Sequence, residues 1–121
     1  IDTDYIIDHI GKFMPPVAAD DPRVDQILSL LDRGNAWIKI CGGYETSLSG
    51  GPEYADVSPI AKRVIKYAPE RVIWGSNWPH VAVPRDQYPD DAEQLDVLLH
   101  WADESIRQKI LVDNPAVLYG F

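Results

Sequence analysis

Four polar side chains of this 121-residue chain stand just after short apolar runs, where predicted strands end. They are His9, Tyr44, Asn77 and His80. A histidine titrates near neutral pH and suits a general base or a metal ligand, whereas an asparagine amide donates and accepts hydrogen bonds but cannot act as a carboxylate base. If the three strands are parallel and adjacent, these side chains converge on the edge of the sheet where α/β folds place their ligands.

Each of these residues also has an ordinary structural interpretation. His9 is compatible with a core histidine bonded to Asp8 or to a backbone carbonyl, Tyr44 with simple packing, and His80 with a surface loop. Other polar residues are expected to be structural: Asp8 as a loop cap, Glu45 and Glu53 as solvated loop carboxylates, and His100 as a mid-helix residue.

Short runs of β-branched and aromatic residues predict the strands that carry this site. Each run ends at glycine or at polar residues, and proline soon after the third run prevents it from continuing in a ladder. Because the runs are mostly apolar, with Lys39 and Arg71 as the charged exceptions, they are typical of strands buried on both faces. The predicted strands cover residues 5–7, 37–41 and 71–74.

Apolar residues at helical spacing follow each predicted strand. Asp21-Pro22 and Ser58-Pro59 have the form of an N-cap followed by proline at the first helical position, and Asp91 with Gln94 forms a plausible capping box. A further short helix is expected at residues 105–111, and Asn114 opens a last turn.

Strand and helix alternate three times, which predicts a parallel α/β sheet with right-handed crossovers in one domain, residues 1–121. Three parallel strands leave two open edges and too few helices to cover both faces. We therefore expect either self-association or pairing with the rest of a larger sheet. The chain starts Ile-Asp-Thr-Asp, without Met, which suggests that an upstream part is missing.

The composition narrows the kinds of partner that this chain is expected to bind and the compartment in which it is expected to work. The net charge of −8 argues against nucleic acid and anionic membranes, while a small-molecule substrate remains open. The only cysteine, Cys41, cannot form a bridge within the chain, so a cytoplasmic setting is expected. The sequence contains no His-x-His pair, no Cys-x-x-Cys pair and no phosphate-binding glycine loop.

Several motifs together resemble the amidohydrolase-2 family, and in particular its 2-pyrone-4,6-dicarboxylate lactonase-like branch. The resemblance runs along nearly the whole chain, and its most specific parts are Asp-His-x-Gly and Trp-Gly-Ser-x-Trp-Pro-His. The motifs lie at residues 7–11, 37–40, 52–57, 71–80 and 114–120.

This resemblance implies a (β/α)8 TIM barrel, of which the chain covers only the last three units, strands six to eight. It makes His9 and Asn77 the catalytic candidates, with Tyr44, Trp78 and His80 lining the substrate pocket. The strand-six histidine binds a metal in some members, so a divalent ion such as zinc is possible in the full-length protein; the metal ligands in this chain stay unassigned.

Two departures from the family pattern bear on the reaction. Asn77 stands where the family has an aspartate, which activates the attacking water or shuttles its proton. The family's lactonases also carry an arginine that holds a substrate carboxylate, and no arginine stands near Tyr44-Glu45-Thr46. We expect a hydrolase of a lactone or related carbonyl compound that is inactive as this fragment. The alternatives are a non-hydrolytic binding relative and a metal-dependent decarboxylase of the same family.

Overall fold

The computed structural model describes residues 2–121, so position 1 of the predicted domain lies outside the described residues. Three parallel strands form one sheet in the order β1-β2-β3. The strands are β1 (Tyr5–Ile7), β2 (Ala36–Ile40) and β3 (Val72–Trp74). They lie within one residue of the predicted runs, and Ile38 pairs with Ile7 on one side and Val72 on the other.

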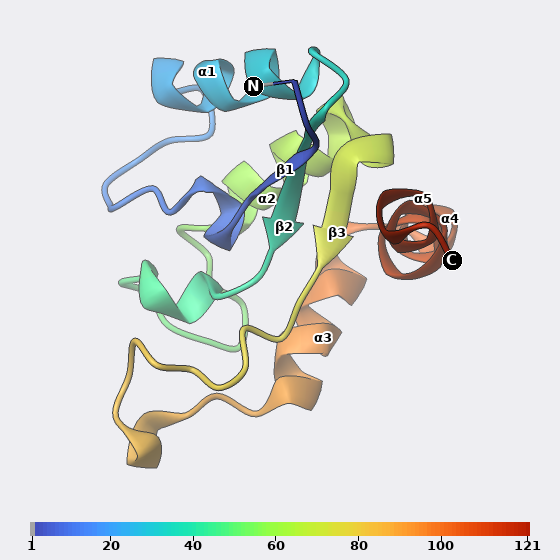
Figure 1. Cartoon of the computed structure of the whole chain (residues 1–121). Coiled ribbons are helices and arrows are strands. Elements are labelled where there is room, and N and C mark those ends of the chain that lie inside the picture. The colour runs from blue at the N-terminus through green and yellow to red at the C-terminus, as the bar shows by residue number, and fades with distance from the viewer. Residues whose placement is uncertain (1) are drawn as a thin grey trace.

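Helices follow each strand, as the alternation predicted (Figure 1). The long helices are α1 (Pro22–Leu31), α2 (Ser58–Tyr67) and α3 (Asp91–Trp101). The chain then ends in α4 (Glu104–Gln108), a π-helical turn (Lys109–Asp113) and α5 (Asn114–Tyr119). None of the helices within residues 2–121 has the length and apolar character needed to traverse a bilayer.

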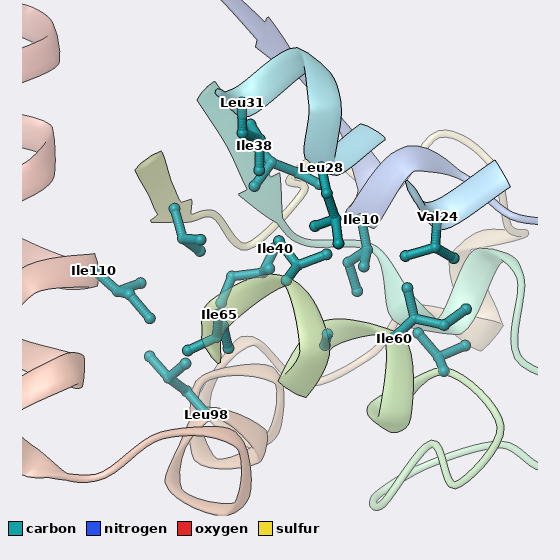
Figure 2. Close-up of a cluster of buried hydrophobic side chains, with 14 of the residues drawn as sticks. Ile10, Val24, Leu28, Leu31, Ile38, Ile40, Ile60, Ile65, Leu98 and Ile110 are labelled. Atoms are coloured by element: carbon teal, nitrogen blue, oxygen red, sulfur yellow. The ribbon is translucent and has the colours of Figure 1, made fainter. Parts of the chain in front are cut away.

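The main core lies between one face of the sheet and these helices (Figure 2). Side chains alternate along a strand, so Ile38 and Ile40 face α1 and α2, while Lys39 between them belongs to the opposite face. Leu98 of α3 and Ile110 of the C-terminal segment complete the cluster. The sheet is therefore held from its helical side, and β1 and β3 are its outer strands.

Helix capping matches the sequence prediction at one helix of three. The Asp21 carboxylate accepts from the Arg23 backbone N–H, as predicted for α1. The predicted cap at Ser58 is wrong, because its hydroxyl instead donates to the Glu53 carbonyl and accepts from the Trp101 indole.

The predicted capping box of α3 is also wrong. Asp90, not Asp91, caps this helix by accepting from the backbone N–H groups of Ala92 and Glu93. Gln94 donates its amide to the Tyr54 hydroxyl at 2.6 Å. Asp91 is thereby left in the first helical turn with its carboxylate free to reach another element, and this becomes important at the site.

The C-terminal segment is tied to the third strand by one buried amide. Asn114, only 3% exposed, donates from Nδ2 to the backbone carbonyls of Pro69 and Val72 at 2.8 and 2.7 Å. The predicted last turn at Asn114 is thus the start of a helix whose first side chain anchors it to the beginning of β3.

Candidate active site

The loops that follow β1, β2 and β3 come together at one end of the sheet (Figure 1). Because the strands are parallel and neighbouring, their carboxyl ends share this edge. His9, Tyr44, Asn77 and His80 all lie here and are joined through one more residue, Glu45. The structure therefore brings together four of the five site residues that the sequence singled out.

Tight backbone turns direct these side chains. His9, Asn77 and His80 have φ angles of 55°, 67° and 60°, in the left-handed region that asparagine and histidine enter more readily than most residues. Between them lies Gly42, with φ 61°. A Cβ at Gly42 would come within 2.9 Å of both the Asn77 Nδ2 and the His9 Nδ1 atoms, so only a glycine allows this approach.

Asn77 is the centre of the cluster. Its Nδ2 atom donates to the Glu45 carboxylate at 2.7 Å and to the Tyr44 hydroxyl at 2.8 Å. An amide nitrogen carries two hydrogens, and both are used by these two bonds. Asn77 therefore links the loop after β3 to the loop after β2.

Glu45 is a residue whose role the sequence reasoning missed. It was expected to be a solvated loop carboxylate, but its side chain is only 5% exposed, and that expectation is wrong. Burial opposes its ionisation, yet hydrogen bonds from Lys12 at 2.8 Å and from Asn77 outweigh this and lower the pKa of Glu45. The carboxylate is thus charged and compensated, and Lys12 is a second missed member of the site.

His9 lies at the edge of this cluster with its ring partly exposed. Its Nδ1 atom is 3.9 Å from a Glu45 carboxylate oxygen and 3.7 Å from the Cys41 sulfur. At 3.9 Å the ring faces the Glu45 carboxylate without a hydrogen bond to it.

The structural alternatives for His9 are not what the structure shows. Asp8 neither bonds to the His9 ring nor caps the loop, and its carboxylate forms an ion pair with Lys39 at 2.8 Å. The expectation that Asp8 is a loop cap is wrong. Burial raises the pKa of the Cys41 thiol, so it stays protonated at neutral pH and is not an activated nucleophile.

His80 is buried, with 3% of its surface exposed, so the alternative of a surface loop histidine is wrong. Its Nδ1 atom is 2.9 Å from the Tyr44 hydroxyl, and its Nε2 atom is 3.1 Å from the Asp91 carboxylate at the start of α3. Burial raises the pKa of Tyr44, which keeps the phenol neutral. Tyr88 packs edge-on against the His80 ring with centroids 5.2 Å apart.

Trp78 lies apart from this network. Its side chain is 74% exposed, and its backbone N–H bonds to the Ser76 hydroxyl. Among residues 2–121 it makes no hydrogen bond to the cluster, so its part in binding substrate stays a prediction. Glu53 is exposed, as expected, whereas His100 lies exposed in the last turn of α3 rather than in the middle of the helix.

A groove of about 940 Å³ runs beside the cluster. It lies between the loop that precedes α1 and the loop that precedes α2, and His9 is at its edge. Asp56 shapes one wall, because its carboxylate accepts from Ser47 and Ser49 and from the Leu48 backbone. The groove provides room for a small molecule to approach His9.

The described part of the chain does not fit a metal centre of its own. Residues 2–121 contain no group of three His, Cys, Asp or Glu side chains that could hold an ion. Near His9 the candidate donors are already engaged, since Glu45 is bound by Lys12 and Cys41 is a neutral thiol.

Sequence comparison finds relatives that are named as a lactone isomerase or as hydrolases. The chain is 43% identical to a D-galactarolactone isomerase from Agrobacterium fabrum and 37% identical to a 4-sulfomuconolactone hydrolase from Hydrogenophaga intermedia, in each case over 95% of its length. It is 34% identical to a 2-pyrone-4,6-dicarboxylate hydrolase from Comamonas testosteroni over 97% of its length. The chain spans about 40% of the length of these curated relatives.

Solved structures agree with this comparison. A crystal structure from Agrobacterium tumefaciens, 41% identical, superposes on the whole chain with a TM-score of 0.89, and the chain covers 43% of it. A second solved structure comes from Pseudomonas putida and is described as a putative 2-pyrone-4,6-dicarboxylic acid hydrolase. It is 28% identical and gives a TM-score of 0.77, and the match covers 97% of the present chain and 43% of the Pseudomonas protein. The three strands and their helices thus match part of amidohydrolase TIM barrels. The family model Amidohydro_2, described as amidohydrolase, matches residues 2–121, and the chain therefore belongs to this family.

Proposed function

We propose that this segment supplies the sixth to eighth strands of a barrel enzyme that opens or rearranges a lactone ring, with His9 and Asn77 at the reacting ester carbonyl. The observation that carries the proposal is the cluster of His9, Glu45 and Asn77 at the carboxyl ends of the strands, in which Asn77 is bonded to Glu45 and His9 Nδ1 lies 3.9 Å from the same carboxylate. The lactone enzymes named among the relatives support the substrate class. Because the chain spans about 40% of them, we expect it to be inactive without the rest of the barrel.

Proton transfer in this site falls to His9. Attack on a lactone carbonyl needs a base that takes a proton from the attacking oxygen and returns it to the leaving oxygen. Asn77 cannot do this, because a neutral amide does not accept a proton near neutral pH. His9 can, and the Glu45 carboxylate 3.9 Å away would stabilise the imidazolium that forms.

The amide at position 77 favours isomerisation over hydrolysis. Hydrolysis consumes a water, which a carboxylate base would activate, and releases a hydroxy acid. Isomerisation moves the acyl group from the ring oxygen to another hydroxyl of the same molecule, so no water is consumed and the composition is unchanged. A site without a carboxylate base directed at water, and related to a lactone isomerase, suits the second reaction better.

The test uses the full-length protein and NMR spectra of a sugar-acid lactone such as D-galactarolactone. Interconversion of lactones without release of the open acid supports an isomerase, and release of acid with uptake of base supports a hydrolase. His9→Gln should abolish either activity, and His100→Gln, at an exposed histidine outside the cluster, should not. Saturable binding with no conversion of any lactone would show a binding protein instead and would overturn the proposal.

A further inference from the structure

Two carboxylates stand at the ends of a continuous chain of polar contacts through the site. Starting from α3, Asp91 lies 3.1 Å from His80 Nε2, and His80 Nδ1 lies 2.9 Å from the Tyr44 hydroxyl. Asn77 Nδ2 lies 2.8 Å from that hydroxyl and 2.7 Å from Glu45. All links are within hydrogen-bond distance, and the chain crosses from the start of α3 to the loops after β2 and β3.

The carboxylate at the first end determines the direction of the first links. The Asp91 carboxylate oxygen lies 3.1 Å from His80 Nε2, where it would repel a ring lone pair, so a hydrogen belongs on Nε2. In the neutral tautomer with that hydrogen the other nitrogen is an acceptor. In the arrangement that we infer, the Tyr44 O–H then donates to His80 Nδ1, and the phenol oxygen is left to accept.

The Glu45 carboxylate, at the second end, determines the direction of the remaining hydrogen bonds. Glu45 is ionised and bound by Lys12, so it too can only accept. Asn77 faces two acceptors, the Glu45 carboxylate and the Tyr44 oxygen, and must turn its NH2 group toward both. Both amide hydrogens are thereby used, and the carbonyl oxygen is the part of the amide that remains for a ligand.

We propose that Asp91 and His80 are positioning residues that orient Tyr44 and, through it, Asn77, so that Asn77 offers the substrate an acceptor and no donor. A ligand carbonyl cannot bind to such a group, whereas a hydroxyl can. The inference rests on the proposed function in one respect: the hydroxyl held by Asn77 is assigned as a substrate hydroxyl beside the one that attacks the lactone carbonyl. The attacking hydroxyl would give its proton to His9, and the new ester bond would form as the ring C–O bond breaks and the ring oxygen takes that proton.

The hydrogen-bond direction is tested by ¹⁵N NMR of the full-length protein near neutral pH. We expect His80 to be the neutral tautomer with hydrogen on Nε2 and none on Nδ1. In Asp91→Asn the obligatory acceptor is lost, so the tautomer with hydrogen on Nδ1 should become populated and the Asn77 side-chain amide resonances should shift. Hydrogen on Nδ1 in the unaltered protein, or an unchanged His80 in Asp91→Asn, would overturn the inference.

Steady-state kinetics of the same Asp91 variants give a second test of the orienting role. Asp91→Asn should lower kcat about tenfold with little change in KM, because the reacting hydroxyl is misdirected while most of the binding surface remains. Asp91→Glu, which restores an acceptor-only group, should recover part of kcat. Glu93→Gln is the matched control, since it removes an exposed charge from the same first turn of α3.

The two proposals can fail separately. If the unaltered protein converts no lactone but His80 shows the expected tautomer and responds to Asp91→Asn, the orienting role stands and the proposed function fails. If lactones are converted and Asp91→Asn behaves like Glu93→Gln in both kinetics and NMR, the orienting role fails and the proposed function stands.

Discussion

Asn77→Asp is the substitution that tests the geometry of the site most directly. In the present structure the Asn77 Nδ2 atom donates to Glu45 at 2.7 Å. The new carboxylate would instead place an oxygen against the Glu45 oxygen. The variant loses a hydrogen bond to a charged group, which contributes about 1.5–3 kcal/mol. It gains a repulsion of about 4 kcal/mol for two like charges roughly 4 Å apart at an effective dielectric constant of about 20.

The two carboxyl groups can relieve this repulsion by sharing a proton. The repulsion raises the pKa of one of the two carboxyl groups above its ordinary value. Between the unfolded and folded pKa of that group the folded variant binds more protons than the unfolded chain, so its stability must fall as pH rises. We expect Asn77→Asp to be destabilised by about 5–7 kcal/mol at pH 8, from the lost hydrogen bond and the repulsion together, and by much less at pH 5.

Unfolding of the full-length protein in urea from pH 5 to pH 8 measures this effect. Glu45→Gln and the double variant complete a cycle, and the double variant should recover about 2–3 kcal/mol at pH 8, because a glutamine amide can donate to the new carboxylate. A variant as stable as the unaltered protein at pH 8, with no pH dependence of its own, would show that residues 45 and 77 do not meet.

The same cycle bears on the reaction. The family pattern predicts that Asn77→Asp raises hydrolysis of lactones, because an aspartate can activate water. The structure adds that the gain should be larger in the double variant, where no second carboxylate competes for the proton. Equal hydrolysis by the single variant, the double variant and the unaltered protein would count against a role for position 77 in water activation.

Three further expectations concern the residues around this pair. Gly42→Ala should destabilise the full-length protein by about 1–2 kcal/mol and reduce activity, because the position has φ 61° and the added Cβ would meet Asn77 and His9 at 2.9 Å. Unchanged thermal unfolding and unchanged turnover would contradict this close approach. Lys12→Met removes a cation that lowers the pKa of Glu45. The stability that Glu45 contributes is present above its unfolded pKa and is lost as pH falls through its folded pKa. Acid unfolding should therefore begin at a higher pH in Lys12→Met than in the control Lys62→Met. If the two acid transitions coincide, the ion pair between Lys12 and Glu45 is excluded. The isolated 121-residue chain should self-associate through its outer strands β1 and β3, which light scattering would contradict by finding a monodisperse monomer.

Local patterns predicted the secondary structure because they depend on neighbours in the chain. The alternation of apolar runs and helical spacing located all three strands to within a residue, and the parallel order follows from strand–helix repetition. Capping was less predictable, because a polar side chain beside a helix start has several competing partners. Ser58 and Asp91 both bond to groups far away in sequence rather than to their own helices.

The site was predicted in outline but not in its electrostatics. Residues that follow strand ends can be identified in the sequence, and His9, Tyr44, Asn77 and His80 were found in this way. Glu45 was not, because a glutamate in a polar loop has no local feature that distinguishes a buried carboxylate from a solvated one. Its burial depends on cationic and amide donors that lie 33 and 32 positions away in the chain.

The sequence by itself determined that three parallel strands would carry an imidazole, a phenol and an amide to a common edge, since strand direction and side-chain type are properties of the chain. Only the tertiary structure decided what these groups do to one another. By placing Asp91 beside His80 and Glu45 beside Asn77, the fold sets a carboxylate at each end of these contacts, and the amide orientation that we infer for Asn77 depends on that arrangement.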